Sequence, residues 1–289
     1  SKDRTGTMPR AQTIRTRRVF YIPGFDPFPA RRYRELYRKE GARQQAIPLR
    51  LSGQGAQGWR VDSQPDGTEV TTDFEVLGWS DLVRDGMSNG IAQTYAQMLR
   101  TAWIYLSTGA LWRMMRLRQG PVVAALYPVG MLLGQLALAV MAGRLTWGAA
   151  AAWLPEALAV GIAIGVVALV LRGFRARDGR IYAYYLMHDY AFSAAHRGAT
   201  PPALEARLAQ FRDRIAAALR EDVDEVLVIG HSSGAHLAVQ VLAGLVRDDG
   251  LPAAGRGPRL GLLSLGHVVP MVGFLPEAGA LRRDLHALS

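Results

Sequence analysis

Two long apolar stretches follow one another in the middle of the chain, and they constrain its fold more than any other feature. Residues 119–143 carry no charged side chain, and residues 145–171 carry one, Glu156. A helix of about 20 apolar residues can cross the roughly 30 Å hydrocarbon core of a bilayer. Gly161 and Gly165 have the spacing that lets two helices approach closely. The pattern predicts a two-helix membrane hairpin, with a pair of buried core helices as the alternative.

Arginine side chains gather at both outer ends of the predicted hairpin. They precede it at Arg113, Arg116 and Arg118, follow it at Arg172, Arg175, Arg177 and Arg180, and occur between the two stretches only at Arg144. The positive-inside rule then places both outer ends in the cytoplasm. We expect residues 1–118 and 173–289 to build one domain on that side, and residues 119–172 to form the hairpin.

The composition restricts partners and chemistry. The chain has a net charge of +10, and only two of its basic residues are lysines, Lys2 and Lys39. This preference for arginine suits a GC-rich bacterial genome, and in a bacterium the predicted hairpin would lie in the inner membrane. A basic surface favours anionic lipid or nucleic acid. No zinc spacing, aromatic RNA-binding run or recognition-helix pattern is present, so we expect a lipid bilayer as partner and no nucleic acid. The chain has no cysteine, and we expect neither a metal nor a cofactor.

Outside the apolar stretches, short β-branched runs alternate with helical patterns. We predict strands at residues 19–23, 46–51, 180–187, 224–229 and 260–265, a β-hairpin within residues 59–74 that turns at Pro65–Gly67, and helices at residues 31–43, 91–117, 201–219, 235–246 and 277–288. The helix at residues 91–117 is amphipathic, which suits a membrane surface or ordinary core packing. The alternation predicts an α/β fold: a mostly parallel sheet flanked by helices, with the membrane hairpin inserted.

A Gly-x-Ser-x-Gly motif lies between a predicted strand and a predicted helix. Its residues are Gly230-His231-Ser232-Ser233-Gly234. A sharp turn of this kind holds the serine in a strained conformation at the N-terminus of the helix, where developing negative charge is favoured. Ser232 is therefore a candidate nucleophile, and a structural Gly-Ser turn is the alternative.

Acyl transfer also needs two backbone N–H groups that stabilise the oxyanion. The amide of Ser233, directly after the candidate nucleophile, is one candidate. The loop after the first predicted strand contributes a second candidate in the amide of Phe25, with Gly24 and Asp26 as further possibilities. The alternative is an ordinary turn at the end of a strand.

Three segments together resemble the α/β-hydrolase superfamily. The run from Gly230 to Ala238 resembles its nucleophile elbow, Phe20–Asp26 resembles its oxyanion strand and loop, and Leu262–His267 resembles the strand that follows the nucleophile helix in lipases. The resemblance implies the fold of that superfamily and the acyl-hydrolase chemistry of serine esterases and lipases. The apolar hairpin departs from the usual family pattern and resembles an inserted anchor.

The histidine and acid that a serine nucleophile needs are harder to place. In the family's chain order they follow the serine. His267 lies directly after a predicted strand and is a candidate, whereas Asp284 and His286 point to different faces of one predicted helix. The adjacent pair His188 and Asp189 suits a polar pair at a sheet edge. We expect the catalytic acid and histidine beyond residue 289, and the chain to be part of a longer protein.

The sequence therefore predicts a membrane-anchored serine hydrolase that cleaves an ester, with a lipid or acyl group as the substrate class. A non-catalytic membrane protein that uses a hydrolase-like fold as an interaction platform is the alternative. A channel or transporter fragment is disfavoured, because the two apolar stretches contain no charge except Glu156.

Overall fold

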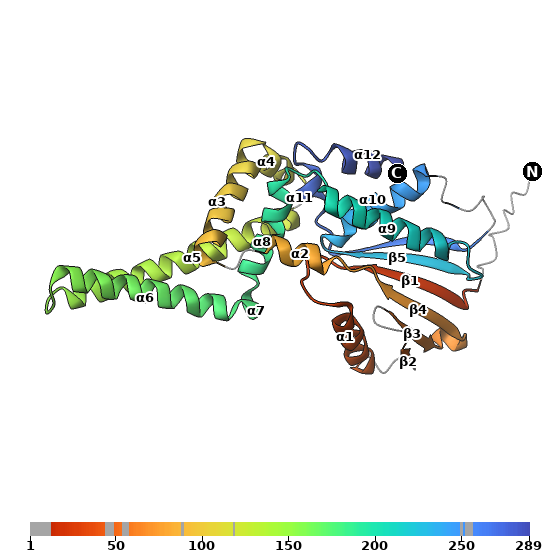
Figure 1. Cartoon of the computed structure of the whole chain (residues 1–289), viewed down its shortest axis with the longest axis horizontal. Helices are drawn as coiled ribbons and strands as arrows, with labels where there is room; N and C mark the ends of the chain where they lie inside the picture. The colour runs from red at the N-terminus through yellow and green to blue at the C-terminus, as the bar shows by residue number, and fades with distance from the viewer. Residues whose placement is uncertain are drawn as a thin grey trace, which may run out of the picture. The chain divides into compact units, whose positions relative to one another are not determined.

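The computed structural model describes residues 13–43, 49–53, 58–87, 90–117, 119–248, 251 and 257–289. The start of the predicted strand at residues 46–51 and Arg118 lie outside these residues. The chain forms two compact units, which are described separately (Figure 1). The first unit comprises Ser1–Gly24, Phe28–Gly78 and Leu208–Gly266, and the second comprises Phe25–Pro27, Trp79–Arg207 and His267–Ser289.

A six-stranded sheet with the order β2-β3-β4-β1-β5-β6 forms the first unit. The strands are β1 (Thr16–Ile22), β2 (Leu49–Gly53), β3 (Gly58–Ser63), β4 (Val70–Val76), β5 (Glu225–His231) and β6 (Arg259–Leu265). Neighbouring strands β4, β1, β5 and β6 are parallel, whereas β3 is antiparallel to both β2 and β4. The predicted α/β class with a mostly parallel sheet is confirmed, as is the β-hairpin that turns at Pro65–Gly67.

Helices flank this sheet: α1 (Ala30–Arg43), α10 (Gly234–Arg247), and α9 (Pro202–Ala218), which belongs to this unit from Leu208 onward. Tyr33 and Tyr37 of α1 pack on Trp59 and Val61 of β3. Helix α10 packs on β1, β5 and β6, and 12 of its 14 residues are buried. The apolar helix after the motif is therefore a core element of the sheet unit.

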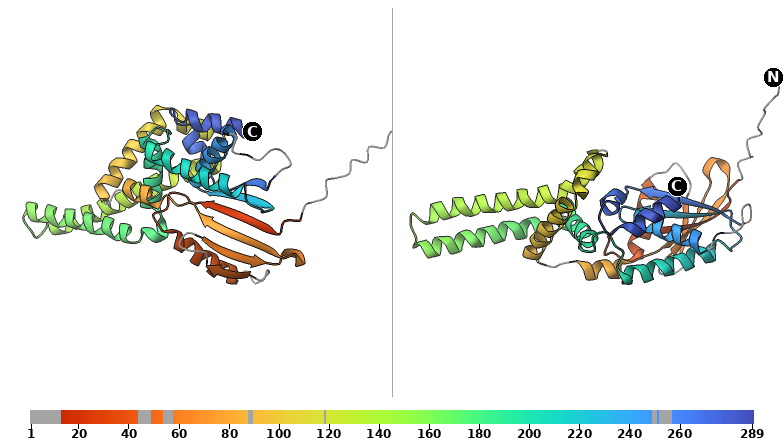
Figure 2. Two further views of the ribbon diagram at one scale, coloured as in Figure 1. Left: turned by 45° about the vertical axis from the view of Figure 1, so that its right-hand side comes forward. Right: turned by 90° about the horizontal axis from the view of Figure 1, so that it is seen from above.

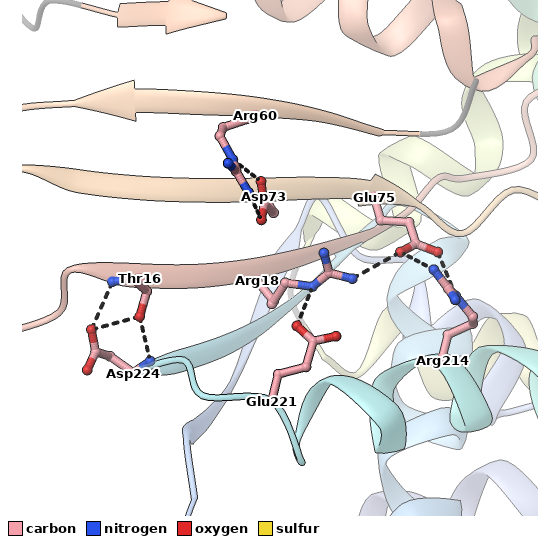
Figure 3. Close-up of polar contacts among 8 residues, drawn as sticks. All are labelled: Thr16, Arg18, Arg60, Asp73, Glu75, Arg214, Glu221 and Asp224. Atoms are coloured by element: carbon pink, nitrogen blue, oxygen red, sulfur yellow. Dashed lines mark hydrogen bonds and ion pairs between the residues drawn. The ribbon is translucent and has the colours of Figure 1, made fainter. Parts of the chain in front are cut away.

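Ion pairs and hydrogen bonds connect β1 with its neighbours (Figure 3). Arg18 on β1 contacts Glu75 on β4 and Glu221 after α9, each at 3.4 Å. Arg214 on α9 also pairs with Glu75, at 2.8 Å. At the start of β1, a carboxylate oxygen of Asp224 accepts the backbone N–H of Thr16 at 2.8 Å. The same oxygen accepts the backbone N–H of Arg15 at 2.7 Å, and the hydrogen bonds from Arg15 and Thr16 hold the pKa of Asp224 below its usual value.

In the described part of the second unit, all regular secondary structure is helical. The helices are α2 (Ser80–Gly86), α3 (Ile91–Ser107), α4 (Ala110–Met115), α5 (Gln119–Ala150), α6 (Glu156–Ala176), α7 (Asp178–Ile181), α8 (Ala183–Ala195), α11 (Val269–Gly273) and α12 (Gly279–Ala287). The helix predicted at residues 91–117 is interrupted between α3 and α4, where Gly109 adopts a left-handed φ of 70°. A left-handed residue cannot continue an α-helix, so the chain changes direction there.

The strand predicted at residues 180–187 is wrong. Residues 183–195 form α8, and His188 and Asp189 are buried within it instead of lying at a sheet edge. The carboxylate of Asp178 accepts the backbone N–H groups of Tyr184 and Tyr185, each at 3.0 Å, and so caps the first turn of α8. This cap, together with burial of one helical face, outweighs the strand propensity of the tyrosines.

The two apolar stretches form the antiparallel helices α5 and α6, which run side by side in every view (Figures 1 and 2). Both are long and apolar enough to span a membrane. The break between them lies at residues 151–155, not at Arg144, which belongs to α5. Pro155 explains the position of the break, because proline disfavours a helical conformation in the residue before it.

The register of α5 and α6 shows which parts of them pair. A Cβ atom on Gly143 would lie 2.6 Å from a methyl group of Val167, so the two helices are in close contact there. Counting from this contact, residues 134–150 of α5 lie opposite α6, a length of about 26 Å at 1.5 Å per residue. The close approach does not use Gly161 or Gly165, since a Cβ on either would meet nothing within 4 Å.

The first third of α5 packs among the other helices of the unit and contains Pro128. Proline has no N–H, so the carbonyl group four residues earlier, that of Ala124, loses its helical partner. The hydroxyl of Tyr190 on α8 donates a hydrogen bond to this carbonyl at 2.9 Å. The tyrosine therefore replaces the missing bond and joins α8 to the base of the hairpin.

Candidate functional site

The motif forms a sharp turn between β5 and α10. Ser232 has a φ of 54°, in the left-handed region that residues with a side chain rarely adopt. Its backbone N–H donates to the carbonyl of Leu265 on β6 at 2.8 Å, and its own carbonyl accepts the N–H of Ala235 at 3.1 Å. Bonds on both sides thus hold the serine in a strained conformation, as is common at functional positions.

Two glycines of the motif lie where the backbone segments are too close for a side chain. A Cβ on Gly234 would lie 2.2 Å from the carbonyl oxygen of Ile22 and 2.5 Å from that of Pro23. A Cβ on Gly230 would lie 2.6 Å from the Cα of Ala235. The turn therefore requires glycine at both positions, because neither set of backbone atoms can move away without disrupting β1 or α10.

The loop after β1 lies beside the serine. A Cβ on Gly24 would be 3.1 Å from the Cβ and 3.6 Å from the Oγ of Ser232. This proximity follows from the parallel pairing of β1 with β5, in which Ile22 is opposite Gly230. The ends of the two strands meet at one edge of the sheet, and the structure brings together Gly24 and Ser232, which are more than 200 residues apart in sequence.

The other predicted site residues are divided between the two units. Ser233 is buried and precedes the first residue of α10, so its amide is at the N-terminus of that helix. Phe25, Asp26 and His267 belong to the second unit. The ring of Phe25 is buried there and packs edge-on against Trp79, with centroids 5.8 Å apart. Trp79 is itself almost fully buried.

Two histidines of the sheet unit are close to Ser232 in sequence, and neither is hydrogen-bonded to it. The ring of His231 is stacked against that of Tyr21, at a centroid distance of 6.3 Å. His236 is buried on α10, where its Nδ1 lies 3.4 Å from the amide nitrogen of Gln240. Burial lowers the pKa of His236 to about 4. His236 is therefore a neutral core residue.

The remaining candidates lie on helices of the second unit. His188 on α8 has its Nδ1 2.9 Å from the side-chain oxygen of Gln97 on α3, and burial lowers its pKa. Asp284 is buried in α12, whereas His286 is exposed. Among the described residues, none is hydrogen-bonded to the Oγ of Ser232, and no cluster of His, Asp and Glu suited to a metal ion occurs.

Comparisons with protein families, with curated proteins and with solved structures found no match to this chain.

Proposed function

We propose that the chain is a membrane-anchored serine hydrolase that cleaves an ester of a lipid or acyl substrate, with Ser232 as the nucleophile. The observation that carries this proposal is the left-handed conformation of Ser232 between β5 and α10. A turn with no chemical role could relieve this strain by placing glycine at the position. Here serine is kept, and both glycine neighbours are required by close backbone contacts.

In this proposal the Oγ of Ser232 attacks the carbonyl carbon of the ester, and the carbonyl oxygen becomes an oxyanion. The amide of Ser233 at the N-terminus of α10 stabilises this charge, since helix N-termini favour negative charge. Gly24 lies beside the serine, and the amide of Phe25, the next residue in the chain, is the proposed second donor. A histidine accepts the serine proton; His267 is the candidate among the described residues.

The paired helices α5 and α6 are the proposed membrane anchor. Most of their apolar surface is exposed: only 22% and 11% of their most apolar segments are buried in the protein. An apolar surface of this size is unstable in water and favours a bilayer. Arg172 and Arg175 lie near the end of α6, and under the positive-inside rule they place the base of the hairpin on the cytoplasmic side.

Labelling with a fluorophosphonate probe tests the nucleophile. The protein in detergent should react with the probe, and Ser232→Ala should abolish the labelling. Ser264→Ala is the matched control, because Ser264 is an exposed serine on the neighbouring strand β6 of the same unit. Gly24→Ala should reduce the labelling rate without abolishing it, because the new methyl group would lie 3.6 Å from the Oγ of Ser232.

Labelling that persists in Ser232→Ala would show that the nucleophile assignment is wrong. Absence of labelling in a folded wild-type protein would favour the second candidate function, a non-catalytic membrane protein that uses this fold to bind a partner. One observation favours that candidate: no described residue is hydrogen-bonded to the Oγ of Ser232 as a general base would be.

A further inference from the structure

An apolar cavity of about 240 Å³ lies within the second unit, among α3, α4, α5, α8 and α11. Met114, Met187 and Met271 contribute to its wall from three different helices, and Ala125 contributes from α5. Methionine side chains are flexible and polarizable, so they adapt to apolar ligands of variable shape. Lining of this kind suits a hydrocarbon group better than a ligand with a fixed polar pattern.

The two tyrosine hydroxyls in the wall already have partners in the protein. The hydroxyl of Tyr105 donates to the carbonyl of Met271 at 2.9 Å, and the hydroxyl of Tyr190 donates to that of Ala124 at the same distance. Burial, with a smaller contribution from the charge of Asp189, raises the pKa of both tyrosines, so both remain protonated donors. No charged side chain lines the cavity. A polar ligand would lose its hydration there and gain few hydrogen bonds in return, since Thr101 is the one other lining residue with a polar side chain.

Part of the cavity wall is exposed at the surface of the unit, on α3 and on α5. Leu106 on α3 and Leu126 on α5 line it, and they are 47% and 48% exposed. Leu99 and Trp103 lie on the same face of α3 as Leu106, at helical spacing, and are also exposed. Exposed tryptophan beside apolar side chains is typical of protein surfaces at a membrane interface.

The wall of the cavity is continuous with the predicted anchor. Ala125, Leu126 and Val129 line the cavity and lie on α5, within about three turns of the part of α5 that pairs with α6. Hydrocarbon that surrounds the paired helices is therefore close to the mouth of the cavity. This continuity indicates a bilayer lipid as the occupant.

We propose that this cavity binds one alkyl chain of a membrane lipid. Its volume exceeds the roughly 150 Å³ of an apolar cavity that holds benzene, and it suits a segment of a chain without the headgroup. The lipid enters between Leu106 and Leu126 and leaves its headgroup at the surface. This binding does not depend on catalysis at Ser232.

A photoreactive lipid tests the proposal. The full chain is reconstituted in phosphatidylcholine nanodiscs that contain a phospholipid with a diazirine in one acyl chain, irradiated, digested and analysed by mass spectrometry. Labelling of α8 and α11 at Met187 and Met271 is expected, because these residues line the cavity. Labelling of α5 and α6 by bulk lipid provides an internal reference.

Two variants with the same substitution on one helix separate the cavity from the bulk lipid. Ala125→Phe should fill the cavity and reduce the labelling of α8 and α11 at least about tenfold. Ala137→Phe should leave it unchanged, because Ala137 is exposed on the paired part of α5. If Ala125→Phe does not fold, Ala102→Phe fills the same cavity from α3. Addition of decane should compete with the probe at α8 and α11 alone.

The outcomes distinguish this proposal from the hydrolase. Ser232→Ala should leave the labelling of α8 and α11 unchanged even though it abolishes fluorophosphonate labelling. Wild-type protein labelled only on α5 and α6 would overturn the cavity proposal, as would labelling of α8 and α11 that survives both cavity-filling variants. Labelling by a diazirine fatty acid but not by the phospholipid would show that the ligand is not a bilayer lipid, which also overturns it.

Discussion

Helices α10 and α6 are both strongly apolar, yet α10 is buried within the protein and α6 is largely exposed. Helix α10 has 14 residues, 12 of them buried against the sheet. Helix α6 has 21 residues, and 11% of its most apolar segment is buried. At 1.5 Å per residue these lengths are about 21 Å and about 31 Å, so only α6 matches the hydrocarbon thickness of a bilayer.

The difference lies in what covers the two helices. Strands β1, β5 and β6 cover α10, and its glycine at position 234 touches the backbone of β1. Helix α6 packs mainly on α5, and Ile164 and Leu169 project from the pair with 64% and 69% exposure. Apolar composition therefore identifies segments that avoid water, while the surrounding structure decides whether the rest of the protein covers them or leaves them exposed.

The largest expected effect comes from adding a methyl group to a glycine in each region. Gly234→Ala should destabilise the protein by more than about 3 kcal/mol, because its Cβ would overlap the backbone carbonyls of Ile22, the last residue of β1, and of Pro23. Gly161→Ala in α6 should be neutral or stabilise by up to about 1 kcal/mol, since nothing lies within 4 Å and alanine favours helix. Thermal unfolding in detergent measures both. Equal effects would contradict the contrast in packing.

A charge on the exposed face of α6 tests whether lipid covers it. Ile164→Arg should weaken membrane insertion by about 3 kcal/mol, the cost of arginine near the centre of a spanning helix. Retention in the membrane pellet after a carbonate wash measures this, with Ile164→Leu as the control. Unchanged retention of the arginine variant would show that this face of α6 is not in hydrocarbon.

Acidification tests the burial of α10 through His236. Because the pKa of His236 is about 4 in the folded protein, the unfolded chain, with a pKa near 6.5, takes up the proton first as the pH falls. The contribution of His236 to the free energy of unfolding is thus fully present above about pH 6.5, and it decreases by about 2 kcal/mol by about pH 4.5. His236→Gln should remove this part of the pH dependence. Unfolding curves that are equally pH-dependent in both proteins would contradict it.

The smallest effect concerns the proline in α5. Tyr190→Phe should destabilise the second unit by about 1 kcal/mol, because the carbonyl of Ala124 then lacks the donor that replaces the missing N–H of Pro128. Pro128→Ala restores the helical N–H, so in that background the tyrosine substitution should cost less. A thermal-melting double-mutant cycle measures the coupling, and additive effects would show that the two residues are independent.

Local patterns in the chain predicted much of this molecule. The apolar run before Gly230 and the apolar helix after Ser233 defined the strand, the turn and the helix, because each depends on neighbours in sequence. The apolar stretches predicted the helical hairpin for the same reason. The failures were also local: strand-favouring tyrosines suggested a strand at residues 180–187, where Asp178 and burial produce α8.

The sequence by itself determined that Ser232 follows a strand and precedes a helix, and that two earlier segments are long and apolar enough to cross a bilayer. Only the tertiary structure decided that Gly24 lies against Ser232, because the pairing of β1 with β5 joins segments that are far apart in the chain. It also decided that Tyr190 completes the hydrogen bonding of α5, and that Gly143, not Gly161, is the close contact of the hairpin. Such contacts depend on the order of strands and the register of helices, which no local pattern encodes.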